Sequence, residues 1–174
     1  MKDRALCRIL LRFDVNDRYY LPLLIGDKLF LGAEDDDFIL DGYTVRHFRD
    51  VTKAQTKNDM YNKILKKEGV IDDIAIPDIT ITNWETIFKS LQKTNKNIIV
   101  EKESLNNEEC EFTIGRIEKI YKHFAYIRHF DADGIWQNEP RKITYAGITS
   151  VTFDSRYITI YSKYLSDLPE GFGR

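Results

Sequence analysis

The sequence FTIGRIEKIYKHFAYIRHF, residues 112–130, carries the pattern on which our prediction of the fold depends. Apolar and polar side chains alternate through most of it, and Lys122 and His123 separate its two halves. Such alternation is typical of half-buried β-strands joined by a short turn. Three similar runs follow, at residues 142–146, 148–153 and 157–163. Five short strands within about fifty residues predict a small, strongly bent sheet, because such a sheet must curl to protect its edges.

The N-terminal third of the chain has a similar pattern. Strand-like runs lie at residues 5–15, 19–25 and 28–32, with turn-forming pairs between them. Asp41-Gly42 lies between two further apolar runs, and this dipeptide favours the positive φ angles of a tight type I′ turn. These signals predict a second β unit.

The middle of the chain changes to a helical period. Residues 58–68 place their apolar side chains on one side of a helix that ends at Gly69. A second apolar stripe has the spacing i, i+3, i+4 and i+7 and follows a capping-box sequence that starts at Thr82. This stripe consists of Trp84, Ile87, Phe88 and Leu91. Residues 74–81, which alternate around Pro77, and residues 97–103 predict two more strands.

These patterns together predict a mainly β (α+β) fold. It consists of two small, strongly bent β units, bridged by a segment with two amphipathic helices. We expect an N-terminal β unit at residues 1–57, a helix–strand–helix–strand bridge at 58–104 and a small C-terminal β-barrel at 105–174. The chain of 174 residues is long enough for these parts to form one compact body with a real core.

One order of strand and turn signals occurs twice. Ile25-Gly26, FILDG at 38–42 and Asp50-Val51-Thr52 are echoed by Ile114-Gly115, FDADG at 130–134 and Ser150-Val151-Thr152. A duplicated unit would produce this order, and so would turns that recruit Asp and Gly independently. Arg-His-Phe also occurs twice, at 46–48 and 128–130, but it follows Asp-Gly in the first copy and precedes it in the second. The two alignments therefore cannot both reflect one ancestral unit.

Four motifs of the C-terminal part carry a family resemblance. They are Ile114-Gly115-Arg116-Ile117, FDADG at 130–134, Ile148-Thr149-Ser150-Val151 and Arg156-Tyr157-Ile158. Their order resembles that of uncharacterised bacterial small-barrel proteins with Sm-like or SH3-like domains, better over residues 112–165 than over 19–54. The resemblance implies an SH3-like or Sm-like barrel. The Asp-x-Asn and Arg-Gly elements with which Sm proteins bind oligouridine have no match, so RNA binding is not implied.

Composition and charge exclude several classes of protein. Apolar residues make up 43% of the chain and aromatic residues 13%, which is not the composition of a disordered protein. Lys and Arg number 26 against 28 Asp and Glu, so the net charge of -2 disfavours bulk nucleic-acid binding. Arg8 and Arg12 interrupt the first apolar stretch, which therefore suits neither a signal peptide nor a membrane span. Cys7 and Cys110 have no disulfide framework. We expect a cytoplasmic protein that does not contact membranes.

The chain has no linear motif of a hydrolase, a nucleotide-binding protein or a metalloprotease, so we expect no cofactor. Asp131 and Asp133 resemble the middle of a calcium loop, but His129 and Pro140 occupy its first and last ligand positions. We therefore expect a hairpin turn and no metal there. The acidic run at 34–37 suits either a solvated loop or a contact with a basic partner.

Pairs of arginine and phenylalanine are the main candidates for binding. Arg46 and Phe48, like Arg128 and Phe130, are two residues apart in predicted strands, so each pair shares one face of its sheet. A guanidinium beside an aromatic ring can stack on a base or hold an acidic peptide, and Trp136 could extend such a surface. The alternative is that both phenylalanines belong to the core, with the arginines at its rim.

Three functions are consistent with these observations. The first is a non-catalytic macromolecular interaction module with a protein partner, of which an acidic immunity-type protein is a narrower form. The second is a single-stranded nucleic-acid binder that uses the Arg and Phe faces. The third is an enzyme without a linear motif, such as a hydrolase with paired carboxylates. Exposed edge strands would also permit a homo-oligomer.

Overall fold

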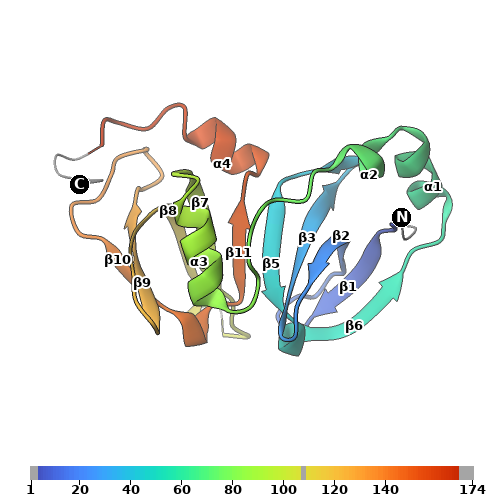
Figure 1. Cartoon of the computed structure of the whole chain (residues 1–174), viewed down its shortest axis with the longest axis horizontal. Coiled ribbons are helices and arrows are strands. Elements are labelled where there is room, and N and C mark those ends of the chain that lie inside the picture. Colours follow the sequence, from blue (N-terminus) through green and yellow to red (C-terminus); the bar gives the residue numbers. More distant parts are fainter. Residues whose placement is uncertain (1–3, 107–108, 169–174) are drawn as a thin grey trace.

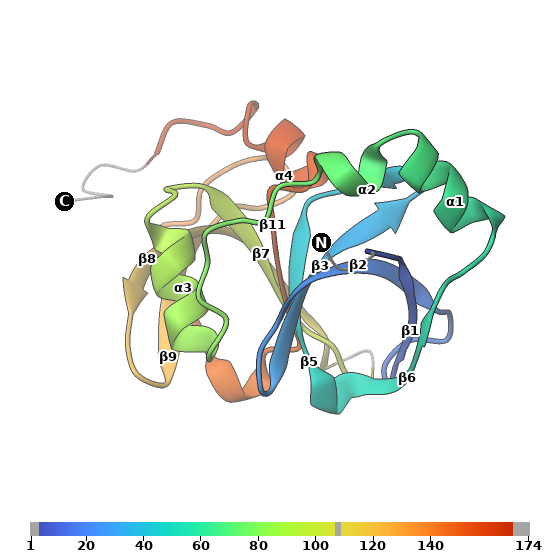
Figure 2. The ribbon, with the colours of Figure 1, turned by 45° about the vertical axis from the view of Figure 1, so that its right-hand side comes forward.

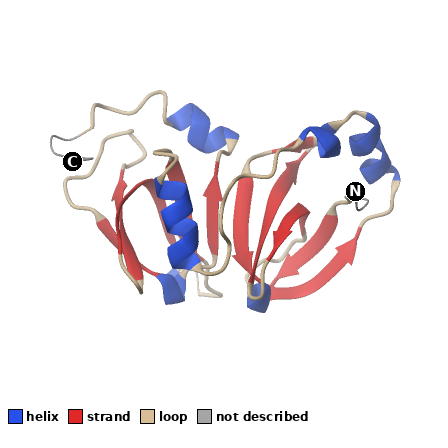
Figure 3. Ribbon diagram, in the orientation of Figure 1, coloured by secondary structure: helices blue, strands red, loops and turns tan. Residues whose placement is uncertain are grey.

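The computed structural model describes residues 4–106 and 109–168 as two β halves that lie side by side (Figures 1 and 3). Within these residues, eleven antiparallel strands form one continuous sheet that is not closed. In Figure 2 the strands of the N-terminal half curve round so that β1 and β6 lie opposite β5. The mainly β class is therefore confirmed.

Each half contributes a consecutive set of strands. The N-terminal half contains β1 (Cys7–Leu11), β2 (Arg18–Ile25), β3 (Leu29–Asp36), β4 (Ile39–Leu40), β5 (Tyr43–His47) and β6 (Val51–Thr56). The C-terminal half contains β7 (Asn97–Lys102), β8 (Glu111–Ile120), β9 (Phe124–His129), β10 (Arg141–Thr144) and β11 (Ser150–Phe153).

The two halves have the same strand order. It is β5-β3-β2-β1-β6 in the first half and β10-β9-β8-β7-β11 in the second, which in both cases is fourth, third, second, first, fifth. A 3₁₀ helix precedes the last strand of each half, at Phe48–Asp50 and at Tyr145–Gly147. One arrangement is thus built twice, and the short β4, which pairs only with β3, is an addition to the first copy.

The echo in the sequence falls on corresponding elements of this arrangement. The two Ile-Gly pairs lie within the second strand of each half or at its end. The segments FILDG and FDADG lie between the third and fourth strands, leaving aside β4. The two Val-Thr pairs at 51–52 and 151–152 lie in the last strand of each half. The repeated Arg-His pair does not correspond, because Arg46 is in the fourth strand of its half and Arg128 in the third of the other. The collinear alignment is therefore the one that matches the topology.

The halves are joined through their strands and through the core. β5 pairs with β11 in register, with Arg46 opposite Ser150 and Tyr43 opposite Phe153. The largest buried cluster also spans both halves, because Val45 of β5 belongs to the same cluster as Val151 of β11. The first half has a second cluster, in which Leu65 of α1 and Ile71 of α2 pack with residues of β2 and β3. Figure 2 shows both helices across the upper end of the curved strands.

Four α-helices accompany the sheet in the described part of the chain. They are α1 (Met60–Lys67), α2 (Val70–Asp73), α3 (Trp84–Gln92) and α4 (Arg156–Tyr161). α3 packs on β8 and buries the whole predicted apolar stripe. Its capping box is made by Asn83 and Thr86, one residue later than predicted. No described helix has the length and apolar character needed to cross a bilayer.

Several predicted elements were wrong. Residues 157–163 lie largely in α4 and not in a strand, because the Ser155 side chain caps a helix by accepting the Ile158 N–H. Residues 74–81 form neither a helix nor a strand. The tight two-residue turn lies at Asp37 and Phe38, both with positive φ, and not at Asp41-Gly42, where only the glycine has one. β7, expected in the bridge, pairs with β8 and β11 and is part of the C-terminal half.

A hydrogen bond connects α3 to the N-terminal half and predicts a dependence of stability on pH. Trp84 Nε1 donates to His47 Nε2 at 3.0 Å, so this nitrogen carries no proton. Burial, and then the charge of Arg49, lowers the pKa of His47. The folded state therefore binds fewer protons than the unfolded state near neutrality. The stabilisation that neutral His47 contributes is fully present above the pKa of histidine in the unfolded chain, about 6.5. It is lost as the pH falls through the lower pKa of His47 in the folded state.

We expect the free energy of unfolding to decrease from about pH 8 to about pH 5, and His47→Gln to reduce this slope. Glutamine keeps an acceptor for the indole but does not titrate. Urea unfolding at several pH values measures both slopes. The slope that remains in the His47→Gln protein includes a contribution from His129, whose pKa is also lowered by burial. Equal slopes for the two proteins would contradict this role of His47.

Candidate functional site

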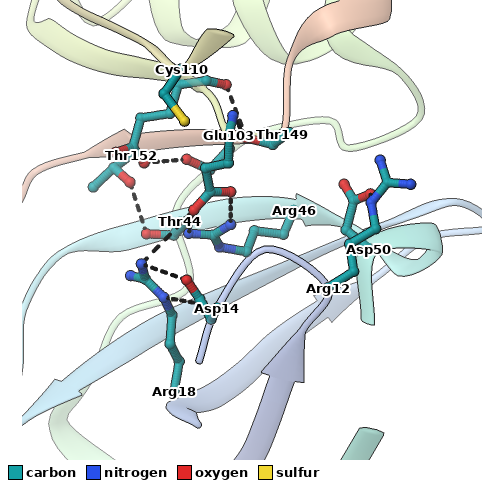
Figure 4. Close-up of polar contacts among 12 residues, drawn as sticks. Arg12, Asp14, Arg18, Thr44, Arg46, Asp50, Glu103, Cys110, Thr149 and Thr152 are labelled. Carbon is teal, nitrogen blue, oxygen red and sulfur yellow. Dashed lines mark hydrogen bonds and ion pairs between the residues drawn. The ribbon is translucent and has the colours of Figure 1, made fainter. Parts of the chain in front are cut away.

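Arg46, a candidate for binding on the strand face that it was predicted to share with Phe48, is buried at the junction of the two halves (Figure 4). Its guanidinium donates to both carboxylate oxygens of Glu103, at 2.6 and 3.3 Å, and to the Tyr20 hydroxyl at 3.0 Å. Glu103 follows β7 of the C-terminal half, whereas Arg46 and Tyr20 belong to the N-terminal half. Arg46 therefore connects the halves and is not part of an exposed surface.

Further polar contacts surround this pair at the junction. Arg18 contacts Asp14 at 2.6 Å and Glu34 at 3.2 Å, and it lies 3.8 Å from Glu103. The Glu103 N–H donates to Thr149 Oγ1, and the hydroxyls of Thr44 and Thr152 are 3.0 Å apart across β5 and β11. Figure 4 shows these groups gathered along the paired strands. The network fixes how the two halves sit against each other.

The other predicted binding residues are spread over three environments. Phe48 is half-exposed and contacts the buried Phe30 ring. Arg128 contacts Glu118 at 2.7 Å and donates to main-chain oxygens of the loop after β9. Phe130 and Trp136 are buried beneath α4 with their rings edge to face, and Trp136 Nε1 donates to the Ser166 carbonyl. These residues do not form the stacking surface that their spacing suggested.

Asp131 organises the turn that follows β9. Its Oδ1 accepts the N–H groups of Asp133 and Ile135, both at 3.0 Å, and its Oδ2 accepts from Gln137 Nε2 at 2.9 Å. Both oxygens are therefore used within the turn. Within residues 4–106 and 109–168, no group of three or more His, Cys, Asp and Glu side chains is arranged to hold a metal ion.

A groove beside α4 brings some of the predicted residues together. This α4 groove has a volume of about 470 Å³ and lies between α4, the first residues of β8 and the chain that follows β9. Its lining includes Phe112, His129, Phe130, Asp131, Arg141, Tyr157 and Tyr161. His129, Phe130 and Asp131 thus share one cavity, whereas Asp133 is not part of its lining.

The acidic run at 34–37 contributes to a separate pocket of about 380 Å³. Asp35, Asp36 and Asp37 line it together with Asp59, two tyrosines and Lys57. Burial raises the pKa of Asp35, whereas the hydrogen bond from Lys57 lowers the pKa of Asp59. Lys57 lies above the Tyr19 ring and contacts Asp59 at 2.6 Å, so the pocket already holds one ammonium group of the chain itself. The hypothesis of a carboxylate-based hydrolase remains a prediction.

A second, partly exposed cluster of aromatic rings was not predicted. On the outer face of the β8–β9–β10 sheet, Tyr121 and Phe124 stack with their ring centres 4.7 Å apart, and Tyr126 meets both edge to face. The side chains of Ala125 and Ile127 point the other way, into the core. The sequence does show Phe124 and Tyr126 on either side of Ala125, and therefore on one face of a strand, but any half-buried strand has the same spacing.

Lysines border these rings. Tyr126 pairs across the sheet with Lys119 of β8 and with Lys142 of β10, and the Lys142 ammonium lies 4.2 Å from the centre of the Phe124 ring. Both lysines are exposed, as are Lys122 and His123 at the tip of the β8–β9 hairpin. We call the surface formed by Lys119, Tyr121, Phe124, Tyr126 and Lys142 the aromatic–lysine face.

This face combines flat apolar groups with positive charge. The one carboxylate on the outer face of β8 and β9 is Glu118, and Arg128 neutralises it. An aromatic ring beside an ammonium suits a ligand that carries both a planar group and a negative charge. Comparisons of the chain with protein-family models, with characterised proteins and with solved structures found no match.

Proposed function

We propose that this chain is a non-catalytic macromolecular interaction module and that the aromatic–lysine face is its contact surface. The observation that carries the proposal is the cluster of three rings on one sheet face between Lys119 and Lys142. The Tyr121 side chain in this cluster is 46% exposed. Apolar groups gathered on a surface and rimmed by polar ones are typical of contact sites.

The composition of the face favours single-stranded nucleic acid as the ligand. Protein interfaces are enriched in aromatic residues but depleted in lysine. Surfaces that bind single strands combine aromatic rings, on which bases stack, with cations that contact the phosphates. Lys119 and Lys142 on either side of Tyr126 match the second description better. The net charge of -2 belongs to the whole chain, whereas on this face of β8 and β9 the one carboxylate, Glu118, pairs with Arg128.

We expect a labelled single-stranded oligonucleotide to bind at low salt and to be released as the salt concentration rises. Tyr126→Ala should weaken binding by about 1–3 kcal/mol, which is the contribution of one stacked base. Lys119→Gln and Lys142→Gln should each reduce the salt slope by about 1, because each removes one phosphate contact. Fluorescence anisotropy at several salt concentrations measures both effects.

Matched controls are available far from the face. Tyr164→Ala removes an exposed tyrosine, and Lys53→Gln removes an exposed lysine of β6. Neither should change the affinity. An acidic peptide of equal charge, added as a competitor, distinguishes a protein ligand from nucleic acid. If no oligonucleotide binds at low salt, or if the controls weaken binding as much as Tyr126→Ala does, the proposal is wrong.

We also propose that both halves are small barrels of the SH3-like kind, as the sequence resemblance implies for the second. The shared strand order and the 3₁₀ helix before each last strand support this assignment. A cytoplasmic location is consistent with Cys7 and Cys110, both of which are free thiols. Fractionation of cells that produce the tagged full chain tests the location.

A further inference from the structure

The α4 groove is a second concave surface of the C-terminal half, and it shares no residue with the aromatic–lysine face. Its volume of about 470 Å³ lies within the range of small-molecule and peptide pockets. Aromatic rings form much of its wall, and an arginine, a histidine and an aspartate supply its charged or titratable groups. These groups define which ligand the groove suits.

We propose that the α4 groove binds the carboxyl end of a peptide whose last residue is aromatic, with Arg141 contacting the carboxylate. Arg141 Nη1 donates to the Phe112 carbonyl and to Thr113 Oγ1, both at 3.1 Å, and these bonds hold the guanidinium at the groove. Among the residues that the structure describes, no carboxylate makes an ion pair with Arg141. Its charge is therefore available to a ligand.

The carboxylate in the groove does not compete for Arg141. Asp131 accepts three hydrogen bonds within its own turn, from Asp133, Ile135 and Gln137. A guanidinium can form two parallel bonds with a carboxylate, which favours this anion as the partner of Arg141. Arg141 is thus the group of the lining that suits a single negative group of a ligand.

The rings of the groove account for the aromatic part of the ligand. The side chains of Phe112 and Tyr157 are 48% and 54% exposed at its rim. Tyr161 stacks on the buried Phe130 with a distance of 5.5 Å between ring centres, so the lining is supported from below. Edge-to-face and offset contacts between aromatic rings contribute beyond the area that they bury.

His129 adds a polar atom without a partner. Its Nδ1 is buried and makes no hydrogen bond with the described residues, and a buried polar atom normally has one. Burial, and then the charge of Arg141, lowers the pKa of His129, which favours the neutral ring. The charged groups that act on it are Arg141 from β10, Arg128 from β9 and Asp131 from the turn. A carboxylate bound at Arg141 would offset the two cations and raise this pKa.

The test uses the full chain and two synthetic probes, N-acetyl-Gly-Phe with a free carboxylate and the same dipeptide as an amide. We expect the free acid to bind about tenfold more tightly than the amide, which corresponds to the loss of a charge-assisted hydrogen bond. We also expect only the free acid to raise the pKa of His129. Calorimetry gives the affinities, and the imidazole Cε1–H signal, assigned with His129→Asn, gives the pKa.

Two variants separate the roles of charge and rings. Arg141→Gln should weaken binding of the free acid about tenfold, and Tyr157→Ala should weaken the acid and the amide equally. Lys119→Gln, on the aromatic–lysine face, should change neither affinity, so that this site and the proposed nucleic-acid surface can fail independently. Equal affinity for acid and amide, or an unchanged affinity in Arg141→Gln, would overturn the assignment. Inorganic phosphate that binds as tightly as the free acid would also overturn it, because the rings would then play no part.

Discussion

Replacing Arg46 by alanine is expected to lower the free energy of unfolding by about 3 kcal/mol or more, because it breaks a buried ion pair. The Arg46 side chain is 2% exposed and forms two bonds to Glu103 and one to Tyr20. Its loss leaves a cavity and removes the main partner of a carboxylate whose side chain is only 16% exposed. Urea unfolding followed by circular dichroism measures the loss.

Arg8→Ala is the matched control for this substitution. Arg8 also pairs with a carboxylate, that of Asp17, but it lies on the surface with 45% of its side chain exposed. Exposed pairs contribute at most about 1 kcal/mol. Arg46→Lys should fall between the two, because lysine keeps the charge and loses the two-pronged contact. Equal losses for Arg46→Ala and Arg8→Ala would show that the junction network does not stabilise the fold.

The second large effect is expected for Gly115→Ala, which should destabilise the C-terminal half by more than about 3 kcal/mol. A Cβ at this position would collide with the carbonyl oxygen of Arg128 and would lie 2.7 Å from the Cα of His129. Both are main-chain atoms of β9, so the strand itself would have to move. The substitution should therefore also abolish ligand binding at the aromatic–lysine face and the α4 groove.

Gly147→Ala provides the control. The nearest atom to a Cβ there is the Lys102 Cδ at 3.5 Å, which is an ordinary contact with a flexible side chain. We expect its effect to stay within about 1 kcal/mol. The measurements are unfolding curves and the dispersion of amide signals in NMR spectra. A Gly115→Ala protein as stable as Gly147→Ala would contradict the close approach of β8 and β9.

Local patterns predicted most of the elements but not all of their types. The stripe Trp84, Ile87, Phe88 and Leu91 is buried in α3 as its period indicated. Residues 157–163 alternate like a strand and yet lie largely in α4, whose Ile158 covers the sheet beside Phe130. For so short a segment the cap at Ser155 and the contact with the sheet outweighed the preference of isoleucine and tyrosine for strands.

The candidate sites were harder to predict than the elements. Alternation correctly placed Arg46 in a strand but could not show that this strand pairs with β11, more than a hundred residues away. The same pattern did not show which aromatic side chains would be buried. Phe130 is buried beneath α4, whereas Phe124 and Tyr126 stay partly exposed. Whether a strand face is exposed depends on segments that are distant in sequence, and the local alternation of side chains contains no information about them.

Three features could be predicted from the sequence alone: the mainly β class, the corresponding order of signals in the two halves and the apolar face of α3. These follow from side-chain period and turn chemistry, which act over a few residues. Three others depend on the folded arrangement: Arg46 joins the halves, Asp131 accepts hydrogen bonds within its own turn, and lysines of β8 and β10 border the rings around Tyr126. Those contacts form when strands that are far apart in the sequence come together in one sheet. This pairing determines which faces are covered and which charges lie close to each other.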